Sequence, residues 1–147
     1  MTVRILGIDP GASTGLACYE NGVLAWLRTI EPHSIEHFLR HHAPARVVFE
    51  DSRLESKVWT SAGSRAAALK IARNVGQIDA WCSLITAICA DLGTPAHGIS
   101  PTAKGAKLNA ESFTVATGWT GRSNQHERDA AMVAWPYRRT VRWPILP

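Results

Sequence analysis

Cysteine is scarce in this 147-residue sequence, and its placement argues against two classes of small protein. The three cysteines, Cys18, Cys82 and Cys89, do not have the paired spacing of a zinc finger. Cys82 and Cys89 lie seven positions apart within a helical pattern, which indicates buried thiols. We therefore expect neither a structural zinc site nor a disulfide framework.

Long apolar runs, low-complexity segments and nucleotide loops are also missing. No stretch looks apolar enough over the length needed to cross a bilayer, and the N-terminus enters a predicted strand without the apolar core of a signal peptide. These features predict a cytoplasmic protein that does not associate with membranes. A Gly-x-x-x-x-Gly-Lys phosphate loop does not occur either.

The composition that remains suits one folded domain, predicted to span residues 1–147. Hydrophobic residues make up 46% of the chain, enough for a core, and 19% charge with six tryptophans argues against disorder. The net charge of +4 and the pI of about 9.3 favour a polyanionic partner, because Lys and Arg displace counterions from phosphates. Many basic proteins never bind nucleic acid, so charge alone does not decide the function.

Five short segments have the apolar or alternating pattern of strands. Asn21-Gly22, between the second and third of them, is a strong hairpin signal. The first three strands therefore form an antiparallel meander, and the later ones alternate with helices. This order predicts an α/β fold with a five-stranded mixed sheet flanked by helices. The predicted strands cover residues 3–9, 14–19, 23–30, 47–50 and 96–100.

Helical patterns occupy most of the remaining chain, at residues 34–42, 64–92, 101–108, 110–117 and 125–135. The longest helix ends at Gly93 and carries an apolar stripe with alternating spacings of four and three, which indicates a seam facing a sheet or a partner helix. The stripe consists of Ile71, Val75, Ile78, Cys82, Ile85, Cys89 and Leu92.

Three acidic residues occupy positions where a site could form. Asp9 closes the first predicted strand, Glu50 closes the fourth, and Asp129 lies in the last helix. Asp9 and Glu50 converge if their strands are neighbours, and a helix over the same edge would add Asp129. Clustered carboxylates need a cation, and hard oxygen ligands suit Mg²⁺ or Mn²⁺. Spacing alone also fits an ordinary turn Asp and a solvated Glu.

Four segments, in order along nearly the whole chain, resemble the motifs of RuvC-type Holliday junction resolvases. Residues 6–15 are similar to the motif in which an Asp precedes a Pro-Gly turn, and residues 47–50 to the strand that delivers a Glu. Residues 67–76 resemble the family's long helix, and residues 126–131 resemble its closing motif, with Asp-Ala three residues after an acidic or His residue. The resemblance implies an RNase H-like fold. Residues 104–109 lack the usual Gly-rich basic run, which is typical of a compact, phage-like or divergent member.

The resemblance also implies roles for four side chains. Asp9, Glu50 and Asp129 would be carboxylate metal ligands. His126, on the same helix face as Asp129, would bind metal or position the attacking water. Glu127 fits an acidic site but is expected to point elsewhere. The implied activity is that of a crossover junction endodeoxyribonuclease, a homodimer that hydrolyses paired phosphodiesters of four-way DNA with two Mg²⁺ or Mn²⁺ ions per site.

Further residues would contact the DNA. Trp59 corresponds to an aromatic that the family wedges into the junction, although a buried or simply exposed Trp is equally compatible. The long-helix stripe would form part of the dimer interface, or it would merely cover the sheet. The candidates for phosphate contact are Lys57, Arg65, Lys70, Arg73, Lys104, Lys107 and Arg122.

Other interpretations remain open. A sugar-kinase-like phosphotransferase uses a hairpin like residues 11–15 but needs two domains and a second nucleotide loop. A non-cleaving module for branched nucleic acid would need a defective carboxylate set. An RNA-processing nuclease of the same fold fits as well. His33, His37 and His41 recur every four residues, and a solvated helix face is favoured over a metal site there.

Overall fold

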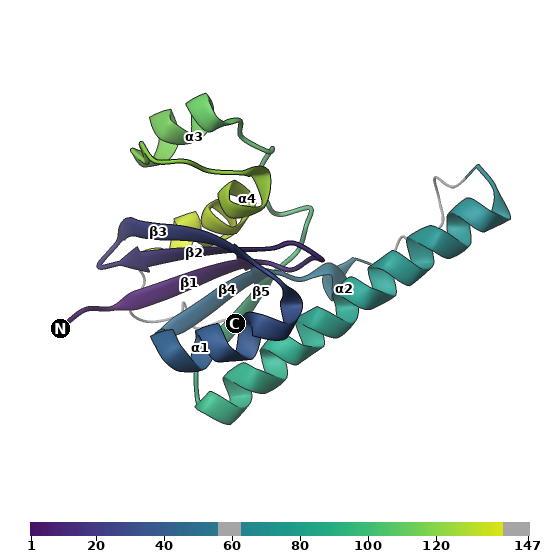
Figure 1. Cartoon of the computed structure of the whole chain (residues 1–147), viewed down its shortest axis with the longest axis horizontal. Helices are drawn as coiled ribbons and strands as arrows, with labels where there is room; N and C mark the ends of the chain where they lie inside the picture. Colours follow the sequence, from purple (N-terminus) through teal and green to yellow (C-terminus); the bar gives the residue numbers. More distant parts are fainter. Residues whose placement is uncertain (56–62, 140–147) are drawn as a thin grey trace.

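The computed structural model describes residues 1–55 and 63–139 and contains a five-stranded sheet with helices on both faces (Figure 1). All five predicted strands are present, with ends within one or two residues of those expected. They are β1 (Arg4–Asp9), β2 (Thr14–Glu20), β3 (Val23–Ile30), β4 (Arg46–Glu50) and β5 (Ala96–Ile99).

The strand order is β3-β2-β1-β4-β5. The first three strands pair antiparallel, and Asn21 and Gly22 make the hairpin turn with φ of 51° and 86°. Strand β4 pairs parallel with both β1 and β5. The predicted mixed sheet is therefore confirmed, and the carboxyl ends of β1 and β4 lie side by side.

The helices form a layer on each face of the sheet. Helices α1 (Ile35–His42) and α2 (Arg65–Leu92) cover one face, α4 (Gln125–Ala134) covers the other, and α3 (Ala110–Thr117) stands beyond α4 (Figure 1). Three short 3₁₀ turns complete the described elements: η1 (Pro32–Ser34), η2 (Ser52–Leu54) and η3 (Trp135–Tyr137).

The strands bury alternate side chains in two separate cores, as a period of two requires. Leu6, Ile8 and Phe49 face α1 and α2, whereas Ile5 and Val48 face α4. The α2 stripe contributes Cys82, Ile85 and Cys89 to the first core, with Ile78 and Leu92 packed at its margin. The prediction that the stripe faces the sheet is thus confirmed for these residues of α2. All three cysteines are free and buried, as expected.

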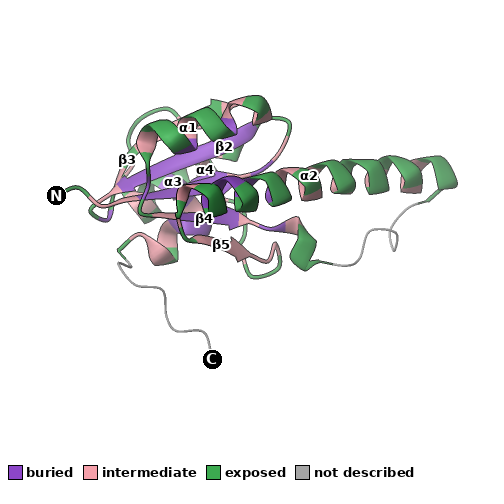
Figure 2. Cartoon of the chain, turned by 90° about the horizontal axis from the view of Figure 1, so that it is seen from below, coloured by how far each residue is buried: buried purple, intermediate pink, exposed green. Residues whose placement is uncertain are grey.

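The N-terminal half of α2 extends beyond the sheet. Figure 2 shows it as a largely exposed projection, and Leu69 on it is 59% exposed. By length and composition, α2 is the one helix in the described part of the chain that could span a membrane, which the sequence was not expected to contain. Alanine, cysteine and isoleucine keep the mean hydropathy of an 18-residue window in α2 at 1.2, although the helix lacks an unbroken apolar run. Its C-terminal half already packs on the sheet.

The helix predicted for residues 101–108 is wrong. This segment forms turns, with the amides of Ala103 and Lys104 donating to the Ser100 carbonyl. Gly105 disfavours a helix here by about 1 kcal/mol relative to alanine, and the ion pairs of Lys104 with Glu50 and Asp129 favour the turn. The turn leads Lys104 back toward the sheet.

Candidate active site

Strand periodicity directs two acidic side chains to the same face of the sheet. Asp9 shares the α4 face with Ile5, and Glu50 shares it with Val48, two residues earlier. Because β1 and β4 are adjacent and parallel, the two carboxyl groups meet, and Asp9 makes a side-chain hydrogen bond with Glu50. The predicted convergence of Asp9 and Glu50 is present in the structure.

Two glycines let α4 approach this edge closely. A Cβ on Gly15 would overlap the carbonyl oxygen of His126, and one on Gly7 would overlap the carbonyl oxygen of Ala130. The backbone of α4 therefore lies directly on β1 and β2. This close contact brings the side chain of Asp129 to the carboxylates on the strands.

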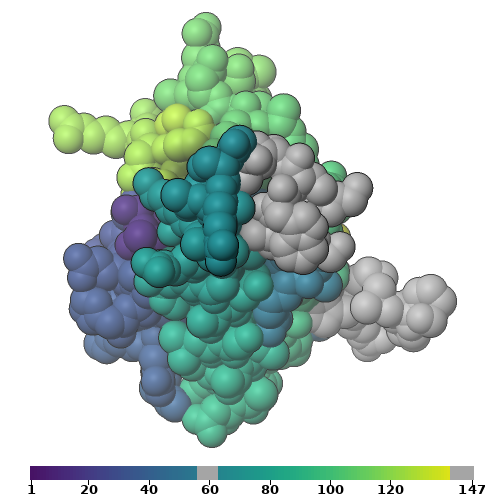
Figure 3. Space-filling view, turned by 90° about the vertical axis from the view of Figure 1, so that its right-hand side faces the viewer, coloured from purple at the N-terminus to yellow at the C-terminus, as the bar shows by residue number. Residues whose placement is uncertain are grey.

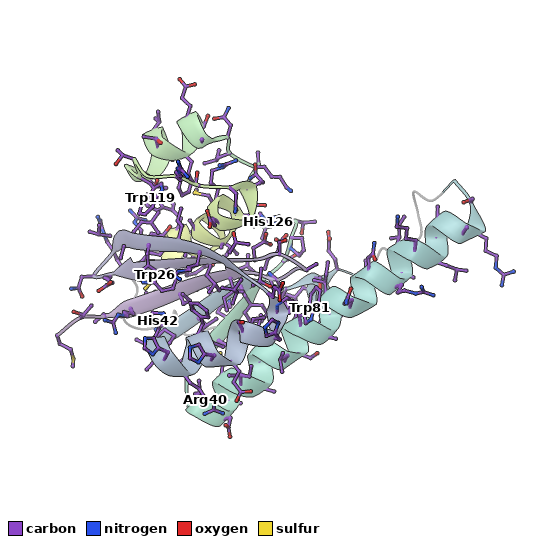
Figure 4. All side chains as sticks on the ribbon, in the orientation of Figure 1. Trp26, Arg40, His42, Trp81, Trp119 and His126 are labelled. Carbon is purple, nitrogen blue, oxygen red and sulfur yellow. The ribbon has the colours of Figure 1, made fainter. Side chains whose placement is uncertain are left out.

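The first turn of α4 is fixed by a capping box. Asn124 accepts a hydrogen bond from the Glu127 amide, and the Glu127 carboxylate accepts one from the Asn124 amide. Thr29 of β3 joins this pair, since its hydroxyl lies 3.0 Å from Glu127 Oε2. Glu127 thus points away from the site, as expected, while His126 lies at the start of α4 above the sheet (Figure 4).

The three carboxylates and His126 line one open cleft of about 420 Å³. Lys104 enters it, with Nζ 3.0 Å from Glu50 Oε2 and 3.7 Å from Asp129 Oδ2. Its side chain is only 9% exposed. Among the described residues no three His, Cys, Asp or Glu side chains are arranged to hold one metal ion. The ammonium group of Lys104 provides the positive charge between the carboxylates.

Crowded charges shift the protonation of this site. Burial, followed by the hydrogen bond with Glu50, raises the pKa of Asp9 from 3.8 to about 7, and the Lys104 charge partly opposes the change. Burial lowers the pKa of Lys104, but its contacts with Glu50, Asp9 and Asp129 together raise it above the ordinary 10.5. Lys104 therefore stays charged, while Asp9 keeps a proton up to neutral pH.

Three further side chains surround Asp129 and Asp9. Lys107 Nζ lies 3.7 Å from Asp129 Oδ2 and is 70% exposed, so it faces the mouth of the cleft. Nδ1 of His126 lies 4.0 Å from Asp9 Oδ2. Gln125 donates to Asp129 Oδ1 over 2.8 Å, a contact that sequence reasoning missed although the i, i+4 spacing permits it.

Four other predicted DNA contacts lie outside the cleft. Arg65, Lys70 and Arg73 are exposed on the projecting half of α2, which points toward the viewer in Figure 3. Arg122 is exposed in the loop before α4. Lys57 and Trp59 lie outside the described residues.

The histidines before and within α1 do not form a three-ligand site. His33 lies in η1 and pairs with Glu31 at 3.2 Å, while His37 and His41 stack with ring centroids 6.0 Å apart. The solvated interpretation of these histidines fits their exposure.

Known structures with the same arrangement were found by comparison of the folds. RuvC of Thermus thermophilus in complex with a Holliday junction substrate aligns with a TM-score of 0.62 at 17% identity, over 95% of this chain and 97% of that one. A second Thermus thermophilus RuvC structure aligns with a TM-score of 0.51 at 14% identity, over 90% and 92%. The chain has a RuvC-like fold. This agreement confirms the RNase H-like architecture expected from the motifs. No family model and no curated protein matches the sequence.

The RuvC-like fold also contains polar residues that the motif analysis did not select. Asp51 follows Glu50 but faces the opposite side of the sheet, where Arg53 binds it through two parallel hydrogen bonds of 2.8 and 2.9 Å. The hydrogen bond from Arg53 lowers the pKa of Asp51, so this carboxylate is ionised and neutralised locally. Strand alternation was the available signal, because it separates Asp51 from the cleft that Glu50 enters.

Proposed function

We propose that this protein is a metal-dependent endonuclease that cleaves four-way or otherwise branched DNA. The observation that carries the proposal is the meeting of Asp9, Glu50 and Asp129, from two strands and a helix, in one cleft of a RuvC-like fold. Carboxylates gathered at this density, beside exposed basic residues, suit the hydrolysis of a phosphodiester.

The donor set of the cleft fits a hard divalent cation. Asp9, Glu50 and Asp129 would supply carboxylate oxygens, and His126 a nitrogen, to Mg²⁺ or Mn²⁺. When bound, two such ions would hold the attacking water and the leaving oxygen of the phosphodiester. Asp9 must lose its proton to act as a ligand, so activity should rise as the pH passes about 7.

The basic side chains of the cleft have separate tasks in this proposal. Lys104 neutralises the carboxylates of the free protein and exchanges them for a phosphate oxygen when DNA enters. Lys107, exposed at the mouth, contacts a neighbouring phosphate. His126, close to Asp9 and half-exposed, positions the attacking water or accepts its proton.

The proposed substrate and assembly extend beyond the cleft. One structural neighbour is a RuvC bound to a Holliday junction, and we propose a branched DNA substrate for this chain as well. A homodimer would place two cleavage sites on one junction, and the exposed Leu69 on the projecting half of α2 would contact the second copy. Arg65, Lys70, Arg73 and Arg122 would then contact DNA around the sites.

The test uses a labelled, immobile four-way junction, matched duplex DNA and a matched RNA junction, each with Mg²⁺ or Mn²⁺. We expect paired nicks in the DNA junction, at sites related by symmetry, which disappear with EDTA and in Asp9→Asn. Tight binding of the junction without cleavage under either metal would replace the nuclease with a binding module. Preferential cutting of the RNA junction would favour RNA processing, and equal cutting of all substrates would remove the branch selectivity.

A further inference from the structure

We propose that Glu50 is held in position by a clamp made of the residues that follow it and of helix α2. The clamp consists of Asp51, Ser52 and Arg53, together with Asp79 of α2. The inference rests on the proposed function, since it assigns these residues to the positioning of a ligand carboxylate. None of the four lies in the candidate catalytic set, and Asp51 is separated from the cleft by the strand itself.

The first half of the clamp is the ion pair between the buried Asp51 and Arg53, whose side chain is 33% exposed. Asp51 is 5% exposed and accepts three hydrogen bonds from Arg53, one from its amide at 3.1 Å and two from its guanidinium. The two guanidinium bonds form a planar fork that defines direction as well as distance. The side chain immediately after Glu50 therefore has one orientation.

Strand β5 presses on Asp51 from the other side. A Cβ on Gly98 would lie only 2.6 Å from Asp51 Oδ2, so no larger residue fits there without displacing the carboxylate. The amide of Asp51 also donates to the Ile99 carbonyl at 2.8 Å, which continues the pairing of β4 and β5 past Glu50. Both the main chain and the side chain of Asp51 are thus fixed.

Helix α2 provides the second half of the clamp. Ser52 donates to Asp79 Oδ1 over 2.6 Å, and the Arg53 guanidinium lies 3.0 Å from Thr86 Oγ1 and 3.3 Å from Ser83 Oγ. The Cys82 thiol donates to the carbonyl of Glu50 itself at 3.6 Å. Residues 50–53 are therefore bound to the part of α2 that packs on the sheet through Cys82 and Ile85.

Stability alone is a poor explanation for this arrangement. Burying the Asp51 carboxylate costs desolvation energy, and an ion pair with a partly exposed arginine adds little stability in return. A fork of charged hydrogen bonds on one side of Glu50, and a helix contact at its carbonyl, instead restrict the main chain from which its side chain enters the cleft. Contacts that orient a metal ligand in this way typically change metal affinity about 10–100-fold when they are removed.

The test compares Asp51→Asn and Arg53→Met with the wild type and with Arg40→Met. Arg40 links α1 to α2 through Asp91 at 2.8 Å, in the half of α2 that follows the clamp, and Figure 4 places it away from His126. It is therefore a matched control that also loses an arginine contact to α2. Mn²⁺ binding is measured by titration calorimetry, and amide exchange of residues 50–54 is measured in the metal-free protein.

We expect amide exchange at residues 50–54 to accelerate about tenfold in the clamp variants, as loss of one charged hydrogen bond predicts. Their Mn²⁺ affinity should fall about 10–100-fold, Arg53→Lys should recover part of it, and Arg40→Met should leave both quantities unchanged. Unchanged exchange and unchanged Mn²⁺ affinity in Asp51→Asn and Arg53→Met would overturn the clamp. So would losses that Arg40→Met reproduces, because they would reflect general stability.

These measurements separate the clamp from the proposed function. If the wild type binds Mn²⁺ but cuts no branched DNA, the nuclease proposal fails while the affinity comparison still judges the clamp. If the wild type binds no Mn²⁺, the metal-dependent function fails, and the exchange comparison decides whether residues 50–54 are held as described.

Discussion

Replacing Asp9 with asparagine should stabilise the metal-free protein while it abolishes cleavage. The wild-type carboxyl is buried beside Glu50, and these surroundings disfavour its charged form. Asparagine has nearly the same shape, carries no charge, and can donate an amide hydrogen to Glu50. The variant therefore removes a charge that the proposed activity needs but that destabilises the folded state.

The size of the effect follows from the pKa of Asp9. Its rise from 3.8 to about 7 means that the folded state holds the proton over a range where the unfolded state has lost it. The contribution of the Asp9 proton to the free energy of unfolding is fully present below pH 3.8 and is lost as the pH rises through 7. At pH 8 the ionised carboxylate costs the folded state at most about 4 kcal/mol, at about 1.4 kcal/mol per pKa unit.

The assay is thermal unfolding in EDTA at several pH values. A protein of this size gains about 2–4 °C in Tm per kcal/mol, so Asp9→Asn should melt up to roughly 16 °C above the wild type at pH 8. The advantage should shrink steadily as the pH is lowered from 7 to 4, because the wild-type carboxyl becomes protonated in both states.

The shape of this pH profile is what tests the reasoning. A Tm advantage that is equal at pH 4.5 and pH 8 would show that the substitution acts through packing or hydrogen bonding and that the Asp9 charge is not penalised. A variant less stable than the wild type at pH 8 would mean that Lys104 fully compensates the charge. The matched variant Thr29→Val, which breaks a polar contact of α4 outside the cleft, should show no pH-dependent gain.

Three other predictions concern packing, DNA contact and a buried hydrogen bond. Gly7→Ala should destabilise the protein by about 1–3 kcal/mol in urea unfolding, because its methyl group would strike α4; Gly76→Ala, with no atom within 4 Å, should instead add about 1 kcal/mol. Lys107→Ala should weaken junction binding and reduce the slope of log affinity against log salt by about 1, and an unchanged slope would exclude a phosphate contact. Tyr19→Phe should lower the free energy of unfolding by about 1 kcal/mol, because its hydroxyl donates over 2.7 Å to the buried Ala131 carbonyl; equal stability would mean that this carbonyl finds another donor.

The convergence of Asp9 and Glu50 was predictable because it follows from local sequence patterns. Asp9 and Glu50 each terminate an apolar run, and a period of two fixes the face once the strands are neighbours. His126 and Asp129 share a helix face through their spacing of three. The sequence could not supply the distance between α4 and the sheet. That distance depends on α4 packing against Gly7 and Gly15, and the sequence does not show which helix lies over these glycines.

The position of Lys104 was the main feature that sequence reasoning misjudged. A helix over residues 101–108 would have carried this lysine on a surface with Lys107, and phosphate contact was the natural expectation for both. The turn at Ser100 instead sends Lys104 into the carboxylates and leaves Lys107 at the mouth. The prediction of a helix over residues 101–108 rested on helical propensity. In the structure, the attraction between Lys104 and the carboxylates of Glu50 and Asp129 favours the turn instead. The projecting half of α2 escaped notice for a similar reason, because an apolar stripe does not reveal where its partner ends.

The glycines beneath α4 change what should be counted as part of this site. Gly7 and Gly15 offer nothing to a substrate, yet each marks a place where the helix backbone rests directly on a strand. A search for relatives that scored only carboxylates and histidine would accept sheets on which the helix stands too far away. Transplanting the four acidic and imidazole side chains onto another α/β scaffold would fail for the same reason, unless the two bare backbone positions were transplanted with them.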